Sequence, residues 1–107
     1  MDFANLIERQ RAYFYSGETR TTAFRLRALK RLQKSLQERK QLLYDAMKED
    51  MNKCEFEVFM TELGLSLDEI RYHIRHITKW NRNKRVTTPL SHFKSKSYLS
   101  PEPYGIA

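Results

Sequence analysis

Cys54 has the most reactive side chain for covalent chemistry, because it is the only thiol in the sequence. A cysteine becomes a nucleophile when its pKa is lowered, usually by a helix N-terminus or a neighbouring cation. Cys54 stands beside Lys53 at the predicted start of a helix, but the sequence places no catalytic partner near it. We therefore interpret it as a small apolar residue in the turn that begins the helix. A lone cysteine also excludes an internal disulfide, which favours a reducing, cytoplasmic setting.

His73 and His76 are three residues apart on a predicted helix, so both rings could reach one metal ion. A zinc site needs at least one further ligand, and a structural site needs four in all. His92 falls in a region predicted to be flexible, and Cys54 lies about five helical turns away. The sequence therefore predicts no metal site, and we interpret the two histidines as surface or subunit-contact residues.

Positive charge is concentrated in residues 71–101, which hold eight Lys or Arg and no acidic residue. Residues 1–70 hold twelve of each sign, so the net charge of +7 arises mainly in this one stretch. The aromatic residues interleaved with the cations are Tyr72, Trp80, Phe93 and Tyr98. Cations and stacking aromatics are what nucleic-acid binding requires, but no known nucleic-acid-binding motif accompanies them. We favour a solvated linker in a larger protein; the alternative is a self-contained basic helical module that binds nucleic acid or an acidic protein partner.

The sequence lacks the other motifs that mark enzyme sites. It has no Gly-rich phosphate loop, no GxSxG or HExxH motif and no paired-carboxylate motif. At 107 residues the chain is one domain at most, and its mixture of 40% hydrophobic and 31% charged residues is typical of a globular protein. We therefore predict no catalytic, cofactor-binding or metal-ligating residue here, and no membrane-spanning segment.

The elements that must position these residues are predicted to be three helices, because all three prolines lie from Pro89 onward. Apolar spacing predicts the first helix over 2–15, ended by Gly17. The second helix begins at Thr21 or Thr22, either of which can cap it, and runs to about Asp50. Its apolar positions are Leu29, Leu32, Leu36, Leu43 and Met47.

The third predicted helix has the clearest apolar seam and ends at Trp80. The seam consists of Phe56, Phe59, Met60, Leu63, Leu67, Ile70, Ile74 and Ile77. Gly64 interrupts it at a cost of about 1 kcal/mol relative to alanine. We interpret this glycine as a point where another backbone or a ligand approaches closely.

Extended chain is predicted from Val86 onward. Residues 97–100 alternate like an edge strand, and Pro101 and Pro103 exclude a central strand. Residues 104–107 resemble the opening of a buried strand. The sequence offers no sheet for this arm to join, so we expect it either to be disordered or to pair with something outside the chain. The prediction is an all-α fold of about three helices followed by an extended arm, divided into 1–85 and 86–107.

Three stretches resemble the N-terminal region of class 3 aldehyde dehydrogenases. They are RQRAYFYSGETRTTAFRLRALKRL at 9–32, EFEVFMTELGLSLDEIRYHIRHITKW at 55–80 and KRVTTPLSHFKSKSYLSPEPYGIA at 84–107. The EPxG element, Glu102 to Gly105, is especially characteristic. The resemblance implies that the chain is a fragment of an α/β aldehyde dehydrogenase that oxidises aldehydes with NAD or NADP, and that the nucleotide-binding domain follows it.

The resemblance places the catalytic residues outside this chain. In the family a cysteine thiolate attacks the aldehyde, a glutamate activates water and an asparagine helps to hold the oxyanion. None of these maps onto a residue present here, and Cys54 does not match the motif of the nucleophile. The resemblance does imply that Thr61 and Leu65 line the substrate entrance. It also implies an oligomerisation strand made of Tyr98, Leu99, Ser100, Pro101, Glu102 and Pro103.

The expected partners follow from the same resemblance. They are the remainder of the dehydrogenase chain and a second copy in a homodimer, or another form of self-association driven by exposed apolar seams. A membrane anchor in a C-terminal part of the parent protein stays open.

Overall fold

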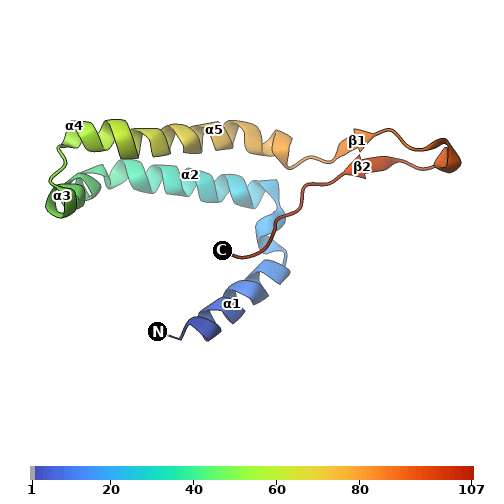
Figure 1. Ribbon diagram of the computed structural model, residues 1–107, viewed down its shortest axis with the longest axis horizontal. Helices are drawn as coiled ribbons and strands as arrows, with labels where there is room; N and C mark the ends of the chain where they lie inside the picture. Colours follow the sequence, from blue (N-terminus) through green and yellow to red (C-terminus); the bar gives the residue numbers. More distant parts are fainter. Residues whose placement is uncertain (1) are drawn as a thin grey trace.

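The computed structural model describes residues 2–107, and it is mostly helical (Figure 1). The helices are α1 (Phe3–Tyr15), α2 (Thr22–Glu38), α3 (Lys40–Met51), α4 (Glu55–Val58) and α5 (Gly64–Trp80), and the strands are β1 (Lys84–Val86) and β2 (Ser97–Leu99). Three short turns are η1 (Glu18–Arg20), η2 (Phe59–Leu63) and η3 (Leu90–His92). Helices α2 and α5 lie side by side, α3 closes one end of the pair, and the β1–β2 hairpin projects from the other end (Figure 1).

The ends of the first two helices are set by residues that the sequence singles out. Gly17 follows α1 with φ +76°, a left-handed conformation that glycine adopts without strain. The Thr21 hydroxyl accepts a hydrogen bond from the Phe24 amide at 3.2 Å, which caps α2. The first helix and the start of the second are therefore confirmed.

The prediction of one continuous helix to about Asp50 is wrong, because the chain breaks at Arg39. The backbone at Arg39 has φ −107° and ψ 18°, so α2 ends there. Helix α3 begins at the next residue and packs against α4. Residues 37–41 are all polar, so no side chain in this stretch holds the helix against α5. The helix ends at Met51, and Asn52 takes the left-handed conformation at the predicted break.

The third predicted helix is continuous but irregular, because a π-helical turn, η2, joins α4 to α5. The Gly64 amide donates to the Phe59 carbonyl oxygen, a bond that spans five residues. A Cβ on Gly64 would lie 2.5 Å from that oxygen. The close neighbour of this glycine is thus a carbonyl of its own helix, and neither a separate segment nor a ligand is needed to explain it.

The core is small and lies where the long helix made by α4, η2 and α5 packs against α2 and α3. Its buried residues are Val58, Leu63, Leu67 and Ile70. The radius of gyration is 20.0 Å, whereas a compact domain of this length has about 13 Å. Helix α1 and the hairpin therefore project from the packed pair, and they are not folded onto it (Figure 1).

The expectation of a helical segment followed by an extended arm with an edge strand is confirmed in part, because the chain is mostly helical but the arm pairs with itself. Strands β1 and β2 are antiparallel, with Lys84 opposite Leu99 and Val86 opposite Ser97. This pairing satisfies backbone groups that extended chain would otherwise leave free. Residues 104–107 form no strand, and Tyr104 is fully exposed, so the predicted buried strand is absent from the described residues. The proposed boundary at 85/86 falls inside β1 and stays a prediction.

Candidate functional site

Thr61 and Leu65 lie one turn apart on the long helix and therefore share a face. Thr61 is in the π turn, where its hydroxyl donates to the Glu57 carbonyl oxygen at 2.8 Å. Leu65 begins the regular helix beyond it and is 61% exposed. The structure thus brings the two residues together on the surface, and their role at a substrate entrance stays a prediction.

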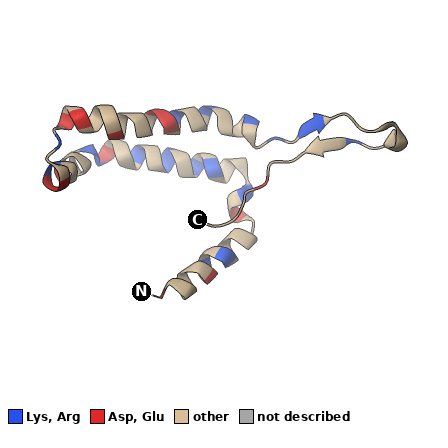
Figure 2. Cartoon of the chain, viewed as in Figure 1, with Lys and Arg blue, Asp and Glu red and all other residues tan. Residues whose placement is uncertain are grey.

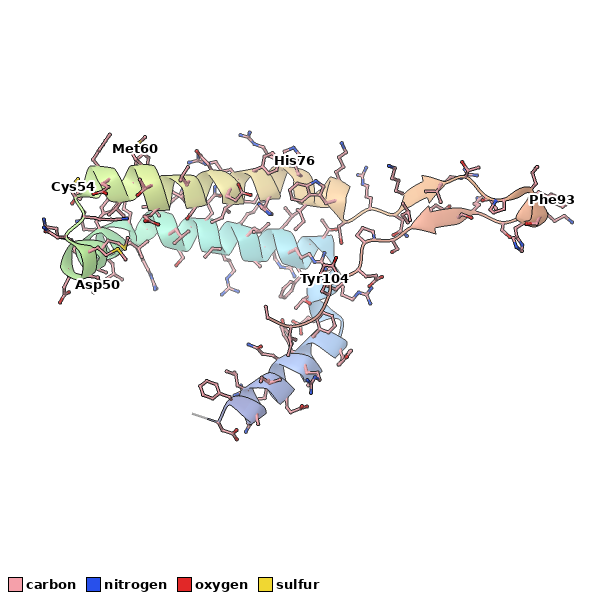
Figure 3. All side chains as sticks on the ribbon, in the orientation of Figure 1. Asp50, Cys54, Met60, His76, Phe93 and Tyr104 are labelled. Carbon is pink, nitrogen blue, oxygen red and sulfur yellow. The ribbon has the colours of Figure 1, made fainter. Side chains whose placement is uncertain are left out.

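Exposed apolar side chains surround these two residues. They are Phe56, Phe59 and Met60, all assigned to the seam from the sequence. A shallow hollow of about 170 Å³ lies beside them, and its lining includes Met60, Gly64 and Leu65 (Figure 3 labels Met60). The π turn explains the exposure, because it adds a residue to the turn and shifts the phase of the seam. The polar residues that line the hollow are Asp68 and Arg71, and they form an ion pair with each other. The rest of the lining offers apolar contact.

A network of polar side chains joins the start of α2 to the end of α5. The Arg25 guanidinium donates to the Thr19 carbonyl oxygen at 3.0 Å and to the Asn81 side-chain oxygen at 2.8 Å. The Asn81 amide nitrogen donates in turn to the Thr22 hydroxyl at 2.7 Å and to the Arg20 carbonyl oxygen at 3.4 Å. Asn81 is therefore hydrogen-bonded through both polar atoms of its amide. It ties together segments about sixty residues apart in the sequence.

The returning limb of the hairpin joins this network. Arg20 forms an ion pair with Glu102, and the Ser100 hydroxyl donates to the Asn83 side-chain oxygen at 2.9 Å. A cavity of about 280 Å³ opens between Arg25, Asn81 and this limb. We call these contacts the arm base, defined by Arg20, Thr22, Arg25, Asn81 and Glu102. They hold both limbs of the hairpin at the point where it leaves the helices.

Of the predicted oligomerisation strand, only Tyr98 and Leu99 lie in β2. Residues 100–103 continue as unpaired extended chain, because Pro101 and Pro103 have no amide hydrogen to donate. Tyr98 and Leu99 are both exposed, so they are open to a partner. Their role in oligomerisation stays a prediction.

The histidines lie in different parts of the molecule. His73 and His76 are on α5, where their Nδ1 atoms lie 2.9 and 2.7 Å from the carbonyl oxygens four residues earlier. The His76 ring contacts both Tyr72 and Trp80, with centroid distances of 4.1 and 5.5 Å. His92 is in η3, at the far end of the hairpin. Across residues 2–107, no three side chains of metal-binding type come together.

Cys54 is exposed and precedes the four-residue helix α4. The neighbouring Lys53 ammonium donates to the Glu62 carboxylate at 2.8 Å. This hydrogen bond raises the pKa of Lys53 above its usual value. The cation next to the thiol is thus paired with a carboxylate on the π turn. Neither the sequence nor the geometry assigns Cys54 a catalytic partner.

Sequence reasoning missed the arm base and the exposed apolar surface on the π turn. A sequence signal for Arg25 and Asn81 is hard to find, because polar contacts between distant residues leave no periodic pattern. The signal for the π turn was Gly64, a glycine inside a strong apolar seam. Among the described helices, none combines the length and apolar character needed to cross a bilayer.

The known proteins that are similar to this chain all belong to one family. No family model matches the chain. It is 35% identical to bovine aldehyde dehydrogenase family 3 member B1 over 104 residues, 97% of this chain and 22% of the relative. It is 33% identical to 4,4'-diaponeurosporen-aldehyde dehydrogenase of Staphylococcus aureus over 105 residues, 94% of this chain and 23% of the relative.

A solved structure agrees with the sequence comparison. The substrate-bound state of Staphylococcus aureus AldH matches 89% of this chain with a TM-score of 0.83 and 33% identity, and the match covers 21% of that protein. The chain spans about a fifth of the length of the relatives it matches. The resemblance noted in the sequence is therefore confirmed: the chain belongs to the class 3 aldehyde dehydrogenases, as one segment of such a protein.

Proposed function

We propose that this chain is the N-terminal helical segment of an NAD(P)-dependent aldehyde dehydrogenase that oxidises aldehydes to carboxylic acids. The segment itself is not catalytic. It packs against the nucleotide-binding domain, shapes the substrate mouth through Thr61 and Leu65, and supports a dimer through residues 98–103. The observation that carries the proposal is the agreement in sequence and fold along nearly the whole chain with enzymes of this activity.

The unpartnered helix faces support a role in packing. An amphipathic helix is stable when its apolar face is covered. Helix α1 leaves apolar side chains exposed along its length, and α2 exposes Leu32 beside its contact with α5. The exposed residues are Phe3, Leu6, Ile7, Tyr13 and Leu32. A larger α/β enzyme supplies the cover that these faces need, and the remainder of the dehydrogenase chain is the proposed partner.

The residues present do not fit a dinucleotide cofactor. Cofactor phosphates are held by a Gly-rich turn at a helix N-terminus. The three glycines are spread along the chain, and Gly64 lies inside a continuous helix. Binding of NAD or NADP, and every catalytic step, is therefore assigned to the rest of the proposed enzyme. The proposed setting is the cytoplasm.

The test compares two polypeptides, the product of the complete gene and residues 1–107 alone. The complete product should reduce NAD or NADP when it is given an aldehyde, and the short chain should give no more than the blank rate. Absorbance of the reduced nicotinamide measures both. Turnover by residues 1–107, or no turnover by the complete product with aliphatic and aromatic aldehydes and either cofactor, would contradict the proposal.

A further inference from the structure

The π turn decides which side chains share a side of the long helix. In a regular helix the Gly64 amide would donate to the carbonyl four residues earlier, whereas here it donates to Phe59, five residues earlier. The turn therefore holds one residue more than a regular turn does. This extra residue brings side chains that are five residues apart toward the same side of the helix.

Met60 and Leu65 show this effect, because they are five residues apart and line the same hollow of about 170 Å³. In a regular helix, side chains with this spacing point about 140° apart around the helix axis. Their relation is set by hydrogen bonding within one helix. It therefore does not depend on which other segments of the proposed enzyme pack nearby.

Gly64 is the residue that makes this turn possible. A Cβ at this position would lie 2.5 Å from the Phe59 carbonyl oxygen and 3.6 Å from Cε2 of the Phe59 ring. A backbone oxygen cannot move aside as the end of a flexible side chain can, so a larger residue must displace the turn. Turns of this kind are rare and occur frequently at functional sites. We therefore expect the turn to serve the surface that it shapes.

Two ion pairs flank the turn. Lys53 pairs with Glu62, and Asp68 pairs with Arg71. Figure 2 shows acidic and basic residues along the long helix. Because the opposite charges of each pair offset one another, the wall formed by Met60 and Leu65 is suited to an apolar ligand.

We propose that Met60 is a specificity-determining residue of the substrate mouth, and that Gly64 is the positioning residue that places it there. The inference rests on the proposed function, which assigns Thr61 and Leu65 to this mouth. Met60 would contact the distal carbons of an aldehyde, away from its carbonyl group. A flexible, apolar thioether side chain suits carbon chains of different lengths. Met60 supplies contact and takes no part in a chemical step.

The alternative is that Met60 packs against another segment of the proposed enzyme. The loss of a packing contact lowers stability and affects every aldehyde alike. The loss of a mouth contact raises KM only for aldehydes long enough to reach it. The dependence of KM on aldehyde length therefore separates the two roles.

The test is the steady-state kinetics of the complete gene product with propanal and decanal. Met60→Ala should raise KM for decanal about fourfold or more, since each methylene removed from contact weakens binding about fourfold. KM for propanal, which lacks the distal carbons, should stay within about twofold, as should kcat for both aldehydes. Gly64→Ala should give the same split. The variant with both changes should be no worse than Met60→Ala, because the two residues act through one contact.

Three control variants separate positioning from loss of stability. Met60→Leu keeps the apolar bulk and should keep the parent KM for decanal. Ser66→Ala, exposed on the same helix, should leave both KM values unchanged. Ile70→Ala removes a buried side chain beyond the turn and should lower stability without changing the ratio of the two KM values.

Several results would overturn the inference. One is a KM for decanal that Met60→Ala leaves within about twofold of the parent value, and another is an equal rise for both aldehydes. A change of the KM ratio in Ile70→Ala, or additive effects of Met60→Ala and Gly64→Ala, would also overturn it. If Gly64→Ala does not fold, the contrast between Met60→Ala and Met60→Leu decides. All of these results leave the dehydrogenase proposal intact, whereas a parent protein that oxidises neither aldehyde removes both proposals.

Discussion

The helix pair and the hairpin arm are held by different forces. The long helix packs on α2 and α3, and its buried side chains are Val58, Leu63, Leu67 and Ile70. The arm buries no side chain and is fixed by the hydrogen bonds and the ion pair of its base. Apolar burial acts over many atoms and is costly to remove, whereas each polar contact of the partly buried arm base contributes about 1 kcal/mol. The arm can therefore be released by changes that leave the helix pair folded.

The largest effect is expected when the core of the pair loses volume. Leu67→Ala should lower the free energy of unfolding by about 2–4 kcal/mol, because the buried side chain leaves a cavity. Urea unfolding of the chain, followed by circular dichroism at the helix band, measures the change. Leu65→Ala is the matched control two residues away on the exposed face, and it should stay within about 0.5 kcal/mol. Equal losses in the two variants would mean that the pair is not held by this core.

The next largest effect is expected at the π turn. Gly64→Ala would place a Cβ 2.5 Å from the Phe59 carbonyl oxygen, so the turn must shift. We expect a loss of about 1–3 kcal/mol in the free energy of unfolding, although alanine is the better helix former. Ser66→Ala, exposed on the same helix, is the control and should be neutral or slightly stabilising. A stabilised Gly64→Ala protein would show that the π turn is not required.

A smaller and more local effect is expected at the arm base. Asn81→Ala removes the bonds to Arg25, Thr22 and the Arg20 carbonyl, at a cost of about 1–2 kcal/mol. Hydrogen exchange at the β1–β2 amides should quicken, while the amides of α5 that face α2 should keep their protection. Ser100→Ala, which removes a single exposed bond, should have the weaker effect of the two. Equal loss of protection in helices and arm would show that the two regions unfold as one.

The smallest effect is expected from the ion pair. Arg20 and Glu102 are each about half exposed, and such pairs contribute less than about 1 kcal/mol. Glu102→Gln should therefore change arm protection slightly, and the difference from the parent should vanish as salt is raised. The matched control is Lys34→Gln, which breaks an exposed pair on α2 and should leave arm exchange unchanged. A salt-independent loss in Glu102→Gln would place more of the arm's stability in this contact than the geometry supports.

The sequence predicts the features that depend on local spacing. The apolar seam predicts the long helix to Trp80, Gly17 and Thr21 mark the helix ends, and Pro101 limits β2. The break at Arg39 is harder to predict, because no helix-breaking residue marks it. It results from the lack of apolar contacts over residues 37–41. The pairing of β1 with β2 escapes prediction, since β1 is short and carries no alternating pattern. Contacts such as that between Arg25 and Asn81 depend on the folded arrangement and leave no trace in either segment alone.

The central claim is that the exposed apolar side chains of α1 and α2 are covered by the rest of an aldehyde dehydrogenase. Side-chain accessibility in the complete protein tests this claim most directly. Oxidative labelling of Phe3 and Tyr13 on α1, and of Leu32 on α2, should be several-fold slower in the complete gene product than in residues 1–107 alone. Equal labelling of the α1 and α2 residues in the two proteins would contradict the account.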